Sequence, residues 1–366
     1  MKVIITPVGT SSLTNGAEES IRQLLAEYAN APNRDDIPNQ QAAALDSYVQ
    51  KRRKFVDKMD KAEAKKNSAE LHSLLILFEE DPPEPRDIIY LIPTATYIGR
   101  LSTLMVSDFL KRMNLNVQEL IVPGLQTKCS ADLRAAFSEL VLQIDAISQQ
   151  YKPQQARLIF NLTGGFKAIQ GFLQTLSVVY ADETIYIFER ERELMRIPRL
   201  PFKMEAKDYV VDNLLLWRRL DLGLTVDCAT LKSIPDTFLF WIGDECILSE
   251  YGTLVWNNVK GELYDKEFLE PPSSKIALAS GFLRSIAGLQ SLQLCQLNSQ
   301  VDKLAKYLET DAADMLKSLS FKKITAGAKP GSTHEFYAWS DNGAKRVFCH
   351  YDTENQVVLD ALGDHL

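Results

Sequence analysis

The feature that most constrains this chain is a short apolar run that ends in a turn with two glycines and leads into a helix. Leu158–Phe160 reads as a buried strand, and Asn161-Leu162-Thr163-Gly164-Gly165-Phe166-Lys167 follows it directly. Glycines let backbone N–H groups approach a ligand closely, and the next helix presents its positive N-terminus. Lys167 adds a point charge that suits a phosphate. The stretch predicts a polyanion cradle, although it lacks P-loop and dinucleotide-loop spacing.

Two further strand ends have a similar composition. The runs Val3–Ile5 and Ile88–Tyr90 each lead into a small loop rich in hydroxyl side chains, just before a helical pattern. In an open parallel sheet, ligands bind beyond the carboxyl ends of the strands, so three such loops would converge on one site. A single loop of this kind is explained equally by Ser/Thr helix capping. We favour a binding site because three occur together.

Strands and helices alternate through the first 200 residues. Strands are expected at 88–92, 118–122, 157–161 and 184–188, and helices at 100–113, 131–149 and 167–180. Residues 39–78 read as helical, with a charged middle that we interpret as a solvated face rather than an RNA-binding patch. The pattern predicts a doubly wound, Rossmann-like α/β domain with a mostly parallel sheet over residues 1–202.

Two of these loops carry a family resemblance. Pro7-Val8-Gly9-Thr10-Ser11-Ser12-Leu13-Thr14-Asn15 and the Asn161–Lys167 turn resemble the signature loops of CARF domains, the Rossmann-like sensors of CRISPR-associated ancillary effectors. The resemblance implies a homodimer that binds a cyclic oligoadenylate on its two-fold axis. We expect cyclic tetra-adenylate, although no motif fixes the ring size. The implied ligand-binding residues are Gly9, Thr10, Ser11, Ser12, Thr94, Thr96, Thr163, Gly164, Gly165 and Lys167. The same loops could also cleave the ring.

Composition excludes a few classes of protein. A net charge of −7 argues against a general nucleic-acid coat, so any nucleic-acid site must be local. The five cysteines show no C-x-x-C pair and no metal-ligand spacing with histidine, and we expect neither a metal nor a cofactor. No apolar run reaches membrane-spanning length and no signal peptide is evident. We expect a cytoplasmic protein without a membrane partner.

The sequence pattern changes over residues 203–272, where short apolar segments are separated by Asp and Gly. The stretch 247–256 resembles a helix of the winged-helix modules that often follow CARF domains. Because the chain is acidic, we expect this winged-helix-like domain to connect or dimerise rather than to read DNA. Residues 270–274 read as a linker.

Residues 273–366 hold three of the four histidines. Helices are expected at 276–289 and 291–319, and strands at 335–339, 345–351 and 356–362. Asp341-Asn342-Gly343 between two of these strands is a strong hairpin signal. Two helices followed by a three-stranded meander predict a compact α+β domain.

Several polar side chains of this domain suit RNA cleavage. Without a metal, the reaction needs a base for the 2′-hydroxyl, positive charge at the phosphate and an acid for the 5′-oxygen. His365, His334 or Glu335 could supply the acid or base, and Arg346 or Lys345 the charge. Alternation along a strand places Lys345 and Arg346 on opposite faces, so only one of them is expected to serve the site. His350 shares the Arg346 face, and we interpret it as inert.

The helix–helix–meander pattern resembles the RelE superfamily of toxin ribonucleases, which cleave messenger RNA, usually in the ribosomal A site. The resemblance implies roles for Arg346, just after the hairpin turn, and for His365. A terminal aromatic residue and two strand lysines of some members are absent, since Leu366, Tyr337 and Trp339 stand there. The whole chain resembles CARF–RelE fusions. It implies mRNA and the ribosome as partners, and the acidic balance points to a ribosomal protein as the contact.

Two alternatives remain open. One is a HEPN ribonuclease, whose Arg-x4-6-His motif lies on a helix; Arg346 and His350 are one residue too close for it, in a segment that reads as strand. The other is a ligand-responsive transcription regulator without nuclease activity. Ring cleavage by Thr10, Ser11 and Lys167 is compatible with the main interpretation.

Overall fold

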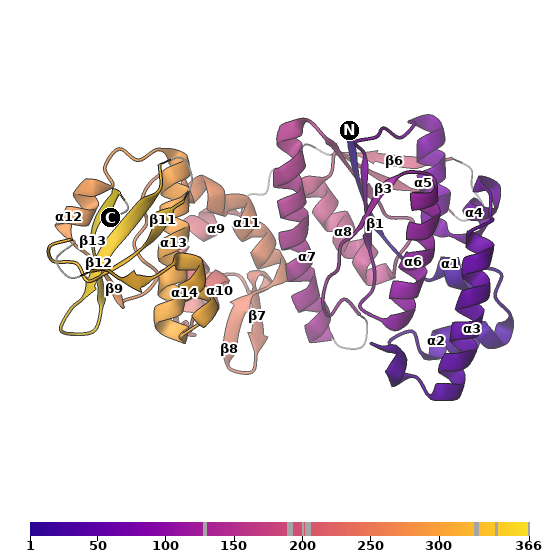
Figure 1. Cartoon of the computed structure of the whole chain (residues 1–366), viewed down its shortest axis with the longest axis horizontal. Helices are drawn as coiled ribbons and strands as arrows, with labels where there is room; N and C mark the ends of the chain where they lie inside the picture. The colour runs from indigo at the N-terminus through magenta and orange to yellow at the C-terminus, as the bar shows by residue number, and fades with distance from the viewer. Residues whose placement is uncertain are drawn as a thin grey trace. The chain divides into compact units, whose positions relative to one another are not determined.

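The computed structural model describes residues 1–126, 130–188, 193–199, 201, 206–325, 329–340 and 343–364. The chain divides into two compact units, Met1–Lys203 and Met204–Leu366, and each is described by itself (Figure 1). In the described ranges, no helix combines the length and apolar character needed to cross a membrane.

A six-stranded sheet in the order β3-β2-β1-β4-β5-β6 forms the centre of the first unit. The first five strands are parallel, and β6 runs antiparallel to β5. The expected mostly parallel α/β sheet is confirmed, and β6 is an addition that the sequence pattern does not indicate. The strands are β1 (Lys2–Pro7), β2 (Ile88–Ile92), β3 (Asn116–Glu119), β4 (Arg157–Asn161), β5 (Glu183–Tyr186) and β6 (Met195–Pro198).

The strand order reverses direction between β1 and β4. From β1 the chain continues to β2 and β3 on one side, and from β4 it continues to β5 on the other. In open α/β sheets, this reversal is where ligands bind, beyond the carboxyl ends of the two strands. The loops after β1 and β4 are therefore in the position that a ligand site requires.

Helices cover both faces of this sheet (Figure 1). Alternate residues of a strand face opposite sides. Ile89 and Leu91 of β2 belong to the core beneath α5 and α6, whereas the Tyr90 hydroxyl lies 3.2 Å from that of Tyr151 in α7. The helices are α1 (Ser11–Thr14), α2 (Glu19–Glu27), α3 (Asn39–Val56), α4 (Lys61–Asn67), α5 (Ala69–Glu80), α6 (Tyr97–Arg112), α7 (Ser130–Tyr151) and α8 (Lys167–Tyr180).

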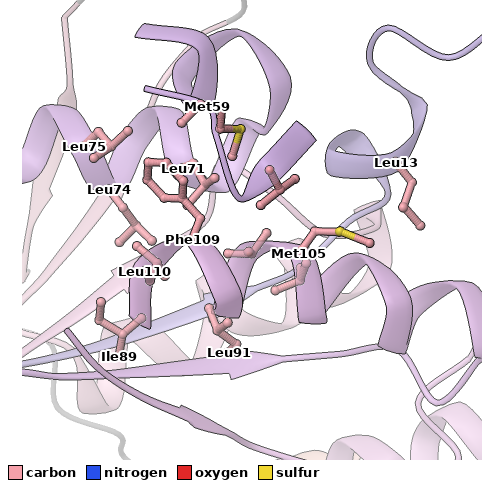
Figure 2. Packing of buried hydrophobic residues seen from close by; sticks show 14 of the residues in the cluster. Leu13, Met59, Leu71, Leu74, Leu75, Ile89, Leu91, Met105, Phe109 and Leu110 are labelled. Carbon is pink, nitrogen blue, oxygen red and sulfur yellow. The ribbon is translucent and has the colours of Figure 1, made fainter. Parts of the chain in front are cut away.

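Apolar side chains fix α5 and α6 to the sheet. Figure 2 shows Leu74 of α5 together with Phe109 and Leu110 of α6 in the packing that includes Ile89 and Leu91 of β2. All of these side chains are at most 2% exposed. Each fully buried side chain of this size contributes about 1.5–3 kcal/mol to folding. Because α5 is held here, its first turn has a defined position relative to the strand ends.

The second unit contains a five-stranded sheet in the order β10-β11-β12-β13-β9 and a separate β7–β8 hairpin. Its strands are β7 (Leu239–Ile242), β8 (Glu245–Leu248), β9 (Ile276–Leu278), β10 (Lys322–Lys323), β11 (His334–Trp339), β12 (Lys345–Tyr351) and β13 (Val357–Asp364). Its helices are α9 (Lys207–Val211), α10 (Leu214–Leu222), α11 (Glu250–Tyr264), α12 (Ser280–Ser285), α13 (Ser291–Thr310) and α14 (Ala313–Leu319).

Two features of this sheet differ from the expected layout. The meander β11–β12–β13 is present, but β10 extends it at one side and β9 at the other. The expected helix at 276–289 is wrong at its start, because Ile276–Leu278 pairs in parallel with Val357–Leu359 along the open edge of β13. Only α12 within that range is helical. The expected hairpin turn lies partly outside the described residues, at Asp341 and Asn342.

A buried ion pair joins two hydrophobic cores of the second unit. One core draws its fully buried residues from 206–269 and the other from 276–359. Arg218 of α10 donates from Nε to Asp302 Oδ1 of α13 at 3.0 Å, and Tyr264 of α11 donates its hydroxyl to Asp302. All three side chains are at most 3% exposed. Removing one charge would leave the other buried without compensation.

Replacing Asp302 with Ala should lower the free energy of unfolding by about 3–5 kcal/mol, because the Arg218 guanidinium would stay buried without a counter-charge. Urea unfolding followed by tryptophan fluorescence tests this, since all four tryptophans lie in the second unit. Glu262→Ala is the control, because Glu262 pairs with Lys266 at the surface and its loss should leave the midpoint unchanged. Equal midpoints for the two variants would contradict the prediction.

Candidate functional site

The loops after β2, β1 and β4 lie side by side, because their strands are neighbours in that order. Val8 donates its N–H to Ile92 O at 3.0 Å, which joins the first loop to the second. A Cβ built on Gly9 would lie only 3.1 Å from Gly165 N, which shows how closely the first loop meets the third. Three segments far apart in the sequence thus form one edge.

A buried carboxylate lies between these loops. Glu70, in the first turn of α5, is 0% exposed. Its Oε1 accepts the Gly9 N–H at 2.7 Å, and its Oε2 accepts the hydroxyls of Ser11 at 2.9 Å and Ser68 at 2.7 Å. Gly9 and Ser11, which we expected to bind a ligand, already bind this internal anion. Sequence reasoning missed Glu70, because it looks like any other acid in a helical stretch.

Packing within the protein requires glycine at both glycine positions of the third loop. A Cβ on Gly164 would lie 2.0 Å from Glu70 Oε1, so only glycine lets the carboxylate sit there. Gly165 has φ +89°, and a Cβ on it would lie 2.9 Å from Pro7 Cβ. Gln170 of α8 fixes the same loop by donating to Gly164 O at 2.9 Å. Close backbone approach therefore explains both glycines.

Four residues with side-chain hydroxyls differ in whether the hydroxyl is free to bind a ligand. Ser12 is buried, with its Oγ 2.6 Å from Ser102 Oγ of α6. Thr96 is also buried and caps α6 by accepting the Gly99 N–H. The fold already uses both side chains, so their expected contact with a ligand stays a prediction. Thr94 is partly buried beside Thr96, with 3.0 Å between their hydroxyls. Thr163 accepts the Ile187 N–H at 3.2 Å.

Thr10 and Lys167 remain exposed at this edge. Thr10 precedes α1 and makes no side-chain capping hydrogen bond. Lys167 is the first residue of α8, whose N-cap residue Phe166 offers no side-chain acceptor. The Lys167 ammonium has no hydrogen-bond or ion-pair partner among the residues that the structure describes. An uncapped helix N-terminus beside a free cation is suited to an anion.

Glu70→Ala should lower local stability by about 1–3 kcal/mol, because the partly buried Gly9 N–H would lose its acceptor. Amide hydrogen exchange of the full chain, read in peptides that cover residues 1–20 and 160–170, measures this. Exchange should become faster in both peptides. Glu79→Ala, at the exposed end of the same helix, is the control and should leave both unchanged. Unchanged exchange in Glu70→Ala would show that the carboxylate does not hold the loops.

In the second unit, Arg346 of β12 and Glu335 of β11 lie on one face of the sheet. Tyr337 of β11 pairs with Arg346 across the strands, and its ring centre is 3.4 Å from Arg346 Cζ. Arg346 Nη1 is 3.6 Å from Glu335 Oε1. Both charged side chains are 3% exposed. Yet Nε and Nη1 of Arg346 and Oε2 of Glu335 lack a hydrogen-bond partner within the described ranges. Buried polar atoms without partners call for a functional explanation.

Two other expected catalytic residues lie elsewhere. Lys345 pairs with Asp364 at an exposed strand end, with 2.7 Å between Nζ and Oδ1. His334 stacks on Phe321, with 5.3 Å between ring centres, and shares the core-facing side of β11 with Phe336. Burial lowers the pKa of His334, and nearby Lys323 lowers it further. The structure therefore brings Glu335, but not Lys345 or His334, to Arg346. His365 lies outside the described residues.

His350, which we interpreted as inert, has a carboxylate partner. Its Nδ1 lies 2.9 Å from Asp360 Oδ1, and Asp360 Oδ2 accepts the Ser332 hydroxyl at 2.7 Å. Asp360 is the extra residue of a bulge in β13, because the register passes from Ala361 opposite Phe348 to Leu359 opposite Cys349. A bulge leaves no clear mark in a pattern of alternating residues, which is why this pair escapes sequence reasoning.

No cluster of three or more His, Cys, Asp or Glu side chains suited to a metal ion occurs in the part of the chain that the structure describes.

A comparison with known families finds a match within the first unit. Residues 65–200 match the family model described as "CRISPR-associated protein (Cas_APE2256)". This stretch runs from α4 to just beyond β6, so it includes Glu70 and the loops after β2 and β4. It covers less than half of the chain. The match supports the resemblance of the first unit to CRISPR-associated proteins.

Comparisons with individual proteins give weaker evidence than the family match. No curated protein matches the chain. Among solved structures, Enterococcus italicus Csm6 bound to cyclic hexa-2′-fluoro-hexa-dAMP is similar over 86% of this chain, at 12% identity and a TM-score of 0.32. This chain spans 64% of the length of that Csm6 chain. A TM-score this low does not establish a shared fold.

Proposed function

We propose that this chain is an ancillary effector of a type III CRISPR system, in which a cyclic oligoadenylate binds the first unit and activates a ribonuclease in the second. The observation that carries the sensor half is the meeting of three strand-end loops at the reversal of strand order. The unit that contains them also matches a CRISPR-associated family over residues 65–200. The ribonuclease half is supported by the unused donors of Arg346.

In the sensor, a ring phosphate is proposed to bind at the N-terminus of α8, beside Lys167 and within reach of Thr10. Glu70 already holds the donors of Gly9 and Ser11, and a phosphate there would meet a like charge. A second copy of the chain would supply the same groups across a two-fold axis, which suits a symmetric ring such as cyclic tetra-adenylate.

Lys167→Ala should weaken the binding of cyclic tetra-adenylate by about 10-fold to 100-fold, the loss expected for one charge-assisted hydrogen bond of about 1.5–3 kcal/mol. Calorimetric titration of the full chain measures the affinity. Lys111→Ala is the matched control, since Lys111 is an exposed lysine in the last turn of α6, at that helix's other end from the loops. Equal weakening by both variants would indicate general attraction to phosphate and would contradict a site at α8.

In the nuclease, Arg346 is proposed to bind the phosphate at which an mRNA is cleaved. The mRNA would lie in the ribosomal A site, and this protein would reach the ribosome through a contact with a ribosomal protein. The Tyr337 ring supports one face of the guanidinium, and Glu335 lies 3.6 Å away without a hydrogen bond. Because Arg346 is 2% exposed, the substrate requires a more open state of this face. Ring binding must then favour the open state over the closed one.

One alternative loses support from the geometry. The HEPN motif requires its Arg and His on a helix, whereas Arg346 and His350 both lie on strand β12. A ligand-responsive regulator without nuclease activity remains the outcome to expect if no RNA is cleaved. The hairpin β7–β8 beside α11 is the part of the chain that such a regulator would use.

Arg346→Ala should slow mRNA cleavage by about 10²–10³-fold, because a preorganised donor to the phosphate is lost. Primer extension on a defined mRNA, in a purified translation system with cyclic tetra-adenylate, measures both rate and position. Lys345→Ala is the control, because it removes a neighbouring cation whose partner, Asp364, is exposed. Loss of cleavage in both variants would argue against a specific role for Arg346. Cleavage of naked RNA at the same rate would contradict ribosome dependence.

A further inference from the structure

We propose that His350 is the general base of the ribonuclease and that Asp360 positions it. This inference rests on the proposed function of the second unit. In the reaction, Nε2 of His350 would accept the proton of the 2′-hydroxyl.

The contact with Asp360 determines which nitrogen of His350 is free. Asp360 Oδ1 and Oδ2 lie 2.9 and 3.1 Å from Nδ1. An ionised carboxylate only accepts hydrogen bonds, so Nδ1 must carry the proton and donate it. In the neutral ring, Nε2 then holds the lone pair. A carboxylate behind an imidazole in this way sets its tautomer and stabilises the imidazolium that forms when Nε2 takes a proton.

The surroundings of His350 leave it open to a substrate. Its side chain is 34% exposed and that of Asp360 is 20% exposed. A second hydrogen bond, from Ser332 to Asp360 Oδ2, holds the carboxylate. Ser332 contacts the carboxylate and not the imidazole, so the three residues do not form the relay of a serine nucleophile. The free polar atom of the group is Nε2.

The position of His350 relates it to Arg346. Both lie on the same face of β12, with Phe348 between them. Arg346 extends toward His350, because its guanidinium contacts Glu335, which pairs with Phe348 across the strands. A phosphate bound by Arg346 would therefore lie on the side from which a base at His350 can approach the neighbouring ribose.

The charged groups that face this surface come from each packed element. Asp360 of β13 contacts His350, and Glu335 of β11 and Arg346 of β12 lie further along the face. Lys322 of β10 lies 3.3 Å from Glu335, and Lys329 lies over Phe348 at 5.0 Å. Among the described residues, the three cations of this face outnumber its two carboxylates, which would favour the approach of a polyanion.

The proposed step moves one proton to His350 and exchanges one phosphorus–oxygen bond for another. Nε2 takes the proton of the 2′-hydroxyl as the 2′-oxygen forms a bond to phosphorus. The bond from phosphorus to the 5′-oxygen breaks, and that oxygen takes a proton from water. The products are a 2′,3′-cyclic phosphate, a free 5′-hydroxyl and an imidazolium that returns its proton to solvent.

The test measures single-turnover cleavage of the defined mRNA on ribosomes, with cyclic tetra-adenylate, as a function of pH. For the unmodified chain, the rate should rise with pH, as expected for a reaction that needs a deprotonated base. His350→Gln should lower the rate by about 10²–10⁴-fold and remove this rise. Asp360→Asn should also lower the rate, because an amide can donate to Nδ1 and hold the tautomer in which Nε2 carries the proton, whereas Asp360→Glu should retain most of the rate.

His72→Gln is the matched control, since His72 is a histidine of α5 in the first unit and has no assigned role in cleavage. It should leave the rate and the pH profile unchanged. A retained urea unfolding midpoint in His350→Gln separates lost chemistry from lost folding, and if that variant is unstable the contrast between the rates of Asp360→Asn and Asp360→Glu decides. An unchanged profile in His350→Gln would overturn the role of His350 and leave the ribonuclease standing. No cleavage by the unmodified chain would overturn both.

Discussion

The binding edge of the first unit depends on one buried carboxylate. Burying an ionised group is costly unless hydrogen bonds compensate it. Glu70 meets this condition with one backbone N–H and two hydroxyls, drawn from the loop after β1 and from Ser68, the N-cap residue of α5. Gly164 in the loop after β4 leaves the space that the carboxylate fills. The loops are thus held in place before any ligand arrives, which lowers the entropy cost of binding.

This arrangement also determines which groups a ligand can meet. A loop rich in glycine and serine suggests free N–H and O–H donors for phosphates, yet the donors nearest the centre of the edge are engaged internally. Positive character remains at the start of α8, where Lys167 is exposed. A polyanion would approach from that side, while the neighbourhood of Glu70 disfavours negative charge.

Several elements could be predicted from the sequence with their observed bounds. Strands 88–92 and 157–161 and helix 167–180 coincide with β2, β4 and α8. Buried parallel strands are continuous apolar runs, and loop residues bound them clearly. The three-residue strand β9 could not be predicted, because an adjacent helical pattern hides it and only pairing with β13 makes it a strand.

The candidate sites were less predictable, since they depend on contacts between distant residues. Ser11 and Ser12 are neighbours with the same side chain, but one bonds Glu70 and the other Ser102. Periodicity could place Arg346 and His350 on one face, yet nothing in it identified Asp360 as a partner. That partner exists only because β13 carries one residue more than its neighbour at that point.

The bulge at Asp360 sets regular strand pairing against the His350 contact. Deleting one residue there would restore an uninterrupted ladder between β12 and β13. The same change would take away the carboxylate that orients the imidazole. The bulge therefore exchanges one regular strand pairing for a contact between a carboxylate and an imidazole.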